Sequence, residues 1–449
     1  MPSTSLTYRA ALRLGTALAP AIGLLSPRWR KGLKARSDAG VRILAWAKSH
    51  RDEGRPLVWF HAASAGEGLQ AEAVLRELRR RCPECQTVYT HFSPSAAGLA
   101  SRIEADAADY LPYDISGNVD RLLSALKPDL LVFAKLDLWP ELSTRAARSG
   151  AHVAIIAGTV SRESSRLRWP ARTILQPGYR VVTAAAAVSS EDGSRLARLG
   201  VEPDRIRILG DPRFDSVVEK VAATSPQDPL LRFGRGAPTL VAGSTWPEDE
   251  AVLLRAYPGV RGTYPHARLI LVPHEPIEDH LARIEQAASD SGLPRPVRLR
   301  AATEATSLLL VDRVGVLAPL YGTGTMAYVG GGFGRAGLHS VLEPAAWSLP
   351  VAFGPRWTNS RDAALLLEEG GGTTLPRGTV AASAALERLW SNWIRDDSSR
   401  MEQGKKARQV VERGRGASES SADMLLQLIS SRSPRKSPSA ERSGQRSAR

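Results

Sequence analysis

The stretch Leu57-Val-Trp-Phe-His61-Ala-Ala-Ser64-Ala-Gly-Glu67-Gly68 runs from apolar, strand-forming residues into a cluster of small residues. Residues 68–81 then carry apolar side chains at the spacing of one helical face: Leu69, Val74, Leu75 and Leu78. The stretch predicts a strand, a tight turn and a helix, which is the first unit of an alternating α/β fold.

Working outward from this stretch, short apolar runs recur between helical segments along most of the chain. We expect further strands at 87–92, 130–133, 153–157, 181–188, 206–209, 239–242, 269–272, 308–311, 326–329 and 351–353. Strands that alternate with helices predict parallel, doubly wound sheets with right-handed crossovers. Periodicity is lost near 210–236, so we expect two Rossmann-like domains that face each other across an interdomain cleft.

Length and composition agree with a globular chain of more than one domain. The 449 residues fit two or three domains of roughly 100–200 residues each, and 43% of them are hydrophobic. The chain has two cysteines, Cys82 and Cys85. They follow a predicted helix and lack further zinc ligands, so we interpret them as ordinary thiols of a protein in a reducing compartment.

The basic excess of the chain, a formal charge of +14, lies mainly at its two ends. Residues 1–36 hold seven basic side chains and no acid, and they enclose the apolar run 14–25. A run of this length is too short to cross a bilayer, so it predicts a segment that lies on an anionic membrane surface. An uncleaved signal peptide and an ordinary core helix are the alternatives.

The other end of the chain, residues 430–449, is rich in serine, arginine and proline. Such a composition cannot bury enough apolar surface to fold, and it predicts a disordered basic tail. The tail either adds membrane adhesion or is simply solvated. A nucleic-acid partner is not expected, because the body between the two ends is nearly neutral.

Three further segments sit where a predicted strand gives way to a helix. After the strand at 130–133 comes Lys135-Leu-Asp137-Leu-Trp139-Pro140-Glu141, which suits either a polar pocket or a helix start. After 239–242 comes Gly243-Ser244-Thr245-Trp246-Pro-Glu-Asp-Glu250, which suits a phosphate, a helix cap or both. Residues 330–337 contain five glycines, which suits a phosphate cradle or a hinge.

Glu67 is the candidate base. A carboxylate at this helix start either caps the helix or accepts a proton from a sugar hydroxyl. His274, in a Pro-His-Glu-Pro segment, has no neighbouring residues that complete a metal site. Neither a metal nor a cofactor is expected.

Taken in order, these segments resemble those of the 3-deoxy-D-manno-octulosonic acid (Kdo) transferases of lipopolysaccharide assembly. The likeness rests on Ser64–Glu67, Asp137–Pro140, Gly243–Glu250, the glycine-rich loop with His339–Pro344, and Gly354-Pro355 with Asn359. It spans roughly residues 8–390. His274 stands where the better known members carry an arginine, and Ser340 stands where they carry an asparagine.

The resemblance implies a GT-B fold and a metal-independent, inverting enzyme at the cytoplasmic face of the inner membrane. It implies CMP-Kdo as donor and a lipid A precursor as acceptor. Glu67 matches the proposed base, and the residues Ser64, Gly66, Lys135 and Asp137 are expected on the acceptor side. The donor side is expected to hold Ser244, Thr245, His274, Gly337, His339, Ser340 and Glu343.

The expected organisation is a membrane-associated leader (1–36), an acceptor domain (37–210), a linker (211–236), a CMP-sugar domain (237–429) and the tail (430–449). A second hypothesis is another membrane-associated GT-B protein, such as a different glycosyltransferase or a sugar-nucleotide epimerase. An epimerase has no need of a basic apolar leader, which favours the transferase.

Overall fold

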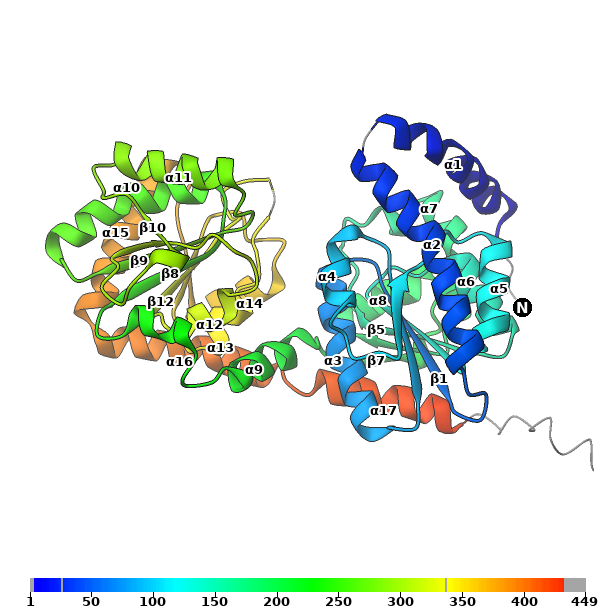
Figure 1. Ribbon diagram of the computed structural model, residues 1–449. Helices are drawn as coiled ribbons and strands as arrows, with labels where there is room; N and C mark the ends of the chain where they lie inside the picture. Colours follow the sequence, from blue (N-terminus) through cyan, green and yellow to red (C-terminus); the bar gives the residue numbers. More distant parts are fainter. Residues whose placement is uncertain (1–3, 26, 336, 432–449) are drawn as a thin grey trace, which may run out of the picture. The chain divides into compact units, whose positions relative to one another are not determined.

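The computed structural model describes residues 4–25, 27–335 and 337–431 (Figure 1). By contacts the chain forms two compact units. Unit 1 comprises the chain up to Ser216 and again from Arg415, and unit 2 comprises Val217–Gly414. Each unit contains a seven-stranded sheet, and every strand pair is parallel. The predicted doubly wound α/β class is therefore confirmed.

The sheet of unit 1 has the strand order β3-β2-β1-β4-β5-β6-β7. Its strands are β1 (Leu57–Ala62), β2 (Gln86–His91), β3 (Ala107–Tyr110), β4 (Leu130–Ala134), β5 (His152–Gly158), β6 (Ala184–Ala187) and β7 (Ile206–Ile208). Its helices are α1 (Leu6–Leu25), α2 (Pro27–His50), α3 (Ala65–Arg81), α4 (Ala97–Ala100), α5 (Ser116–Leu126), α6 (Pro140–Arg148), α7 (Ala171–Arg180), α8 (Ser190–Leu199) and α17 (Ala417–Ser430).

The sheet of unit 2 has the order β10-β11-β9-β8-β12-β13-β14. Its strands are β8 (Thr239–Thr245), β9 (Arg268–Pro273), β10 (Val297–Arg298), β11 (Leu308–Leu310), β12 (Met326–Val329), β13 (Val351–Phe353) and β14 (Gly372–Thr374). Its helices are α10 (Pro247–Thr263), α11 (Glu278–Asp290), α12 (Leu317–Tyr321), α13 (Leu342–Ala346), α14 (Arg361–Glu368), α15 (Thr379–Arg395) and α16 (Asp397–Arg413).

The central strands are buried on both faces, as a parallel sheet covered by helices requires. All residues of β1, β2 and β4 are buried, and so are those of β12 and β13. Burial of continuous apolar runs is the main stabilising contribution, at about 25 cal/mol per Å² of apolar surface. The two sheets therefore act as rigid supports for the loops at their carboxyl ends.

The boundaries of the domains differ from those expected at three places. The predicted leader does not end at residue 36, because α2 continues to His50 and packs on α5 and β3. The predicted linker contains a helix, α9 (Arg213–Ala223), at the boundary between the units. The predicted tail is not among these differences, because its residues from 432 onward lie outside the described residues.

The third difference is α17, which the sequence assigned to the second domain. It lies against α3 in unit 1 (Figure 1). Asp215 caps its first turn, since its carboxylate accepts the backbone N–H groups of Gly416 at 2.7 Å and Ser418 at 2.8 Å. The apolar residues Met424 and Leu425 of α17 then complete the core on that face of the sheet.

No helix among the described residues is long and apolar enough to span a bilayer. The start of α1 is fixed to the body of unit 1 by side-chain hydrogen bonds. The hydroxyl of Tyr8 donates to Asp114 at 2.7 Å, and Arg9 pairs with Glu141 at 3.0 Å.

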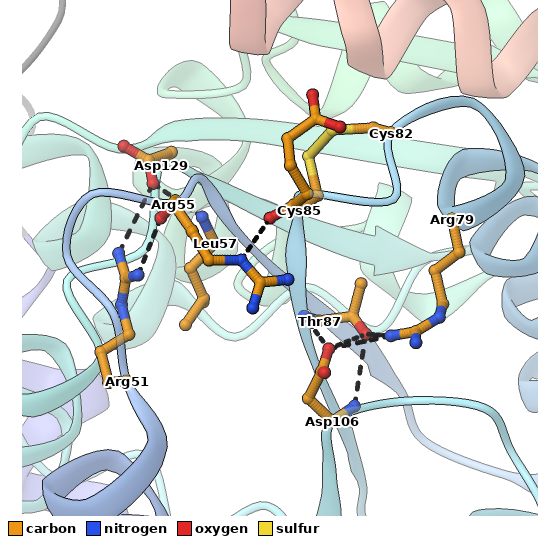
Figure 2. The surroundings of a disulfide bond; sticks show 10 residues. Arg51, Arg55, Leu57, Arg79, Cys82, Cys85, Thr87, Asp106 and Asp129 are labelled. Carbon is orange, nitrogen blue, oxygen red and sulfur yellow. Dashed lines mark hydrogen bonds and ion pairs between the residues drawn. A yellow bond between two sulfur atoms is a disulfide. The ribbon is translucent and has the colours of Figure 1, made fainter.

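Cys82 and Cys85 form a disulfide, so the interpretation as two ordinary thiols is wrong (Figure 2). Both side chains are buried, and their Cα atoms are 5.4 Å apart, within the range that a disulfide requires. The end of α3 at Arg81 explains the pairing, because the chain turns through residues 82–85 and enters β2 at Gln86. Arg79, in the last turn of α3, pairs with Asp106 at 2.8 Å.

Candidate active site

The strand order of unit 1 defines one crevice position. β1 and β4 are neighbours, and the chain proceeds from them toward opposite edges of the sheet. Doubly wound sheets bind ligands beyond the carboxyl ends of strands at such a switch point. The turn after β1 carries Ser64, the first turn of α3 carries Gly66 and Glu67, and the loop after β4 carries Lys135 and Asp137. The structure thus brings all five predicted residues of this unit to one edge of the sheet.

Glu67 lies in the first turn of α3, which begins three residues earlier than the sequence indicated. Its Oε2 atom accepts the backbone N–H of Ser64 at 3.0 Å and the hydroxyl of Ser64 at 3.2 Å. Within the described parts of the chain, Oε1 has no hydrogen-bond partner. One oxygen therefore caps the helix while the other stays available, so the two interpretations of Glu67 are compatible.

Asp137 lies in a polar cluster at the ends of β1 and β4. The indole N–H of Trp139 is 3.1 Å from Asp137 Oδ2 and 3.0 Å from His61 Nε2, and Arg166 donates to Asp137 Oδ1 at 3.2 Å. Burial acts to raise the pKa of Asp137, but the hydrogen bond and charge of His61 and the charge of Arg166 hold it below its usual range. The cluster thus keeps an ionised carboxylate in a fixed position. Sequence reasoning had not singled out His61 or Arg166.

Lys135 follows β4 in the left-handed backbone region, with φ of 58°. This conformation is uncommon for a residue with a side chain and often marks a functional turn. Its backbone N–H donates to Ile156 O at 2.9 Å, which fixes the turn to β5. In the part of the chain that the structure describes, its ammonium group has no partner. The turn therefore presents an uncompensated positive charge beside Asp137.

Unit 2 has the same kind of switch point, between β8 and β12. The turn after β8 contains Ser244, with φ of 53°, and the long glycine-rich loop follows β12. The two loops touch, because a Cβ on Gly330 would come within 2.3 Å of Ser244 O. This contact explains why a glycine is needed at position 330.

Thr245 does not offer its hydroxyl to a ligand. It is fully buried and donates to Glu250 Oε1 at 2.9 Å. The other oxygen of Glu250 is 2.9 Å from His280 Nε2. The expected hydroxyl–phosphate contact of Thr245 is therefore replaced by a structural bond inside unit 2, and only Ser244 of this pair reaches the surface.

Asp249 joins the first turn of α10 to the glycine-rich loop. Its Oδ2 atom accepts the backbone N–H groups of Trp246 at 3.0 Å and Gly331 at 2.8 Å, and its Oδ1 atom accepts the hydroxyl of Tyr328 at 2.7 Å. Burial raises the pKa of Asp249 to about 6. The helix cap differs from the one that the sequence indicated, because the N-cap residue is Trp246 and not Ser244 or Thr245, and only the acid at the third helical position, Asp249, plays its expected part.

The glycine-rich loop closes on itself in a narrow turn. Gly331 and Gly337 have φ values of 92° and 85°, and a Cβ on Gly331 would lie 2.1 Å from Gly337 O. The backbone N–H of His339 returns to Gly330 O at 3.1 Å. These contacts favour a defined cradle over a loose hinge.

Three aromatic rings stack beside this cradle. Trp246 and His274 have ring centroids 5.0 Å apart, and His274 and His339 have centroids 4.4 Å apart. The indole N–H of Trp246 donates to His339 Nε2 at 2.9 Å. His274 is exposed at the outer side of the stack. The structure thus brings two predicted donor residues together, and it adds Trp246, whose place directly after β8 was the available signal.

We predict that His339 stays neutral well below neutral pH. Burial lowers its pKa, the charge of His274 lowers it further, and the value is about 4. The bond from Trp246 agrees, since a nitrogen that accepts a hydrogen bond carries no proton. An NMR titration should show a neutral His339 ring from about pH 8 to about pH 5. In Trp246→Phe the pKa should rise; a titration of the unchanged chain near the ordinary value of about 6.5 would contradict this account.

Glu343 and Ser340 complete the expected donor set. Glu343 lies in α13, and its Oε1 atom is 3.0 Å from the ammonium group of Lys220 in α9. Ser340 is exposed just before this helix. Lys220 was hidden from sequence reasoning, because it lies in the segment interpreted as a linker.

Among the described residues, no group of three or more His, Cys, Asp and Glu side chains could hold a metal ion.

Comparison with known proteins finds similarity to one family of enzymes along most of the chain. A family model described as 3-Deoxy-D-manno-octulosonic-acid transferase (kdotransferase) matches residues 38–216. A 3-deoxy-D-manno-octulosonic acid transferase of Haemophilus influenzae is 26% identical over 420 residues, which cover 90% of this chain and 93% of the relative. The enzyme of the same name from Chlamydophila psittaci is 28% identical over 337 residues, which cover 72% of this chain and 76% of the relative.

Solved structures with similar folds belong to the GT-B class. A UDP-GlcNAc 2-epimerase from Neisseria meningitidis, bound to UDP-GlcNAc, superposes with a TM-score of 0.60 at 14% identity over 83% of this chain and 100% of the epimerase. A glycosyltransferase from Rickettsia africae superposes with a TM-score of 0.56 at 10% identity, over 84% of this chain and 100% of the glycosyltransferase. These likenesses confirm the predicted fold.

Proposed function

We propose that this chain, which belongs to the Kdo transferase family, transfers Kdo from CMP-Kdo to a lipid A precursor at the cytoplasmic face of the inner membrane. Family membership makes it a Kdo glycosyltransferase of lipopolysaccharide biosynthesis. The observation that carries the finer proposal is the position of the motif residues, because they gather at the switch points of both sheets.

The cradle and ring stack of unit 2 support the assignment of the nucleotide. Exposed aromatic rings such as His274 suit stacking with a nucleobase. Backbone N–H groups of a glycine-rich loop at a switch point suit a phosphate. Glu343, beyond the loop, has the two acceptor oxygens needed for ribose hydroxyls. We therefore assign CMP to unit 2.

The proposed chemistry is a single inverting displacement. The hydroxyl oxygen of the acceptor attacks the anomeric carbon of Kdo while Glu67 Oε1 takes the proton of this hydroxyl. The bond between the anomeric carbon and the phosphate oxygen of CMP breaks on the opposite side. Lys135 attracts the anionic sugar, and Asp137 orients the acceptor. The leaving phosphate is stabilised by backbone dipoles of unit 2. This scheme requires no metal ion.

The amino-terminal helices support the membrane assignment. Leu6 is 80% exposed and Leu14 is 63% exposed on α1, and the first 36 residues are strongly basic. Exposed apolar side chains beside basic ones suit the surface of an anionic bilayer. The contacts of Tyr8 and Arg9 with unit 1 would then hold the acceptor loops near the lipid.

The direct test is to incubate the full chain with CMP-Kdo and a lipid A precursor in detergent micelles. Mass spectrometry should show that the acceptor gains Kdo and that CMP is released. A parallel incubation with UDP-GlcNAc tests the alternative suggested by the epimerase fold. An unchanged acceptor together with epimerised UDP-GlcNAc would overturn the proposal.

We predict that Lys220→Met weakens CMP binding about 2- to 5-fold, because Lys220 orients Glu343 through a half-exposed ion pair. Glu343→Gln should weaken binding at least as much. Lys405→Met, an exposed lysine of α16, is the matched control and should change nothing. Calorimetric titration with CMP measures all three, and equal affinities in Lys220→Met and the unchanged chain would contradict the role of Lys220.

A further inference from the structure

A hollow of about 380 Å³ opens beside the glycine-rich loop of unit 2. Its lining comes from this loop and from two segments that follow β13 and β14. The lining residues are Gly334, Arg335, Gly337, Pro355, Arg356, Thr358, Asn359 and Arg377. The hollow thus has three guanidinium groups and one amide, and no acidic side chain lines it.

The loops around this hollow are held together by backbone contacts. The backbone N–H of Arg356 donates to Gly332 O at 2.8 Å, and its guanidinium donates to Gly334 O at 3.3 Å. Gly332 packs so closely on Gly354 that a Cβ would come within 2.7 Å of its backbone nitrogen. Because the two loops are fixed to each other, Arg335 and Arg356, both exposed, line the same hollow.

The charge of the hollow is not neutralised inside the protein. In the described part of the chain, Arg335, Arg356 and Arg377 make no ion pair. Two acids lie near the loop: Asp249 accepts the backbone N–H of Gly331 at 2.8 Å, and the carboxylate of Glu248 would lie 3.5 Å from a Cβ at Gly334. Neither of them lines the hollow.

A second hollow, in unit 1, shows the usual arrangement. It measures about 520 Å³, and acids accompany its cations. Arg145 pairs there with Asp120 at 2.6 Å, and Lys127 pairs with Glu53 at 2.6 Å. Such pairs are structural, whereas an uncompensated group of arginines favours an anionic ligand.

We propose that the arginine hollow binds a phosphate monoester. Three guanidinium groups match a group that carries nearly two negative charges and three acceptor oxygens better than they match a single carboxylate. With the proposed function as premise, this group is a phosphate of the lipid acceptor, bound in unit 2 beside the donor cradle. Free inorganic phosphate and the phosphate of released CMP share the same chemistry.

Calorimetry on the full chain tests the site without any transfer reaction. Glucosamine 1-phosphate should bind, and glucosamine should not. Combined replacement Arg335→Gln, Arg356→Gln and Arg377→Gln should weaken phosphate binding by ~10-fold or more. Arg388→Gln, at an exposed arginine of α15, is the control and should bind as the unchanged chain does. Equal binding by the triple variant, or no binding by the unchanged chain, overturns the site.

Two additional arms separate the sources of the phosphate. Saturating CMP should leave the binding of glucosamine 1-phosphate intact; displacement would assign the hollow to the nucleotide and overturn the acceptor assignment. In the transfer assay, the triple variant should have a higher KM for the phosphorylated precursor than the unchanged chain has. With a phosphatase-treated precursor, the two should have the same KM. Phosphate binding in a chain that transfers no Kdo would refute the proposed function and leave the site intact.

Discussion

Glu141→Ala is expected to lower the stability of unit 1 by about 3–5 kcal/mol, the usual cost of removing one partner from a buried ionic network. The Glu141 side chain is fully buried at the start of α6. Its carboxylate accepts from Thr4 at 2.5 Å, Ser116 at 2.7 Å, Arg9 at 3.0 Å and Arg145 at 2.5 Å. Truncation would remove the acceptor of the buried Thr4 and of the partly buried Arg9, while Arg145 would keep its pair with Asp120.

The same change should release α1. Asp114 caps α6 through the backbone N–H groups of Glu141 and Leu142, and it accepts the hydroxyl of Tyr8. In Glu141→Ala, Thr4 and Arg9 lose this acceptor, and the remaining contacts of this end of the chain are those of Tyr8 with Asp114, of Thr4 with Thr144 and of α1 with α2. Hydrogen exchange followed by mass spectrometry should therefore show faster exchange in α1 and α6, together with a lower melting temperature.

Glu104→Ala, at an exposed acid of the same unit, is the control and should change stability by no more than about 0.5 kcal/mol. The pH dependence adds a check. Burial acts to raise the pKa of Glu141, but hydrogen bonds from Thr4, Arg145, Ser116 and Arg9 lower it to about 2. The stabilisation is thus present above about pH 4.5 and lost as pH falls toward 2. The free energies of unfolding of Glu141→Ala and of the unchanged chain should therefore converge in acid. A constant difference would refute the ionic origin.

Glu67→Gln is expected to reduce Kdo transfer by about 10²- to 10⁴-fold, the range that general base catalysis contributes. The amide oxygen of glutamine still accepts from the backbone of Ser64, so the cap of α3 is kept. What is lost is a group that can take the acceptor proton. The affinity for CMP should not change, because CMP is assigned to unit 2.

Glu72→Gln is the matched control on the same helix, where Glu72 only pairs loosely with Arg76 at 3.9 Å. It should transfer Kdo at the rate of the unchanged chain. Turnover and CMP affinity are measured in the same preparations. Normal turnover by Glu67→Gln would remove Glu67 from the mechanism, and loss of both properties would indicate damaged structure.

Most of the architecture could be predicted because its central strands are buried on both faces. Such strands read as continuous apolar runs, as at Leu130–Ala134 and Met326–Val329. The strands β3, β10 and β14 were missed because they lie at or next to sheet edges, are only two to four residues long and are incompletely buried. The predicted strand at 181–188 was too long, since α7 reaches Arg180 and β6 begins only at Ala184.

The site could be predicted in part because its residues follow strands, where a motif and its position coincide. Glu67 and Asp137 are of this kind. Partners that approach from elsewhere in the chain left no local signal. Lys220 comes from α9, in the segment that was interpreted as a linker, and Arg166 from the short 3-10 helix Ser165–Leu167 beyond β5. The disulfide of Cys82 was misjudged because a spacing alone does not show whether two thiols turn toward each other.

The most direct test of the account is the configuration of the transferred sugar. The full chain, CMP-Kdo and a lipid A precursor are incubated with EDTA, and the anomeric centre of the product is compared with that of the donor by NMR. A single displacement assisted by Glu67 predicts transfer without added metal and inversion at this carbon. Retention of configuration, or transfer that stops in EDTA and returns with a divalent cation, would contradict it.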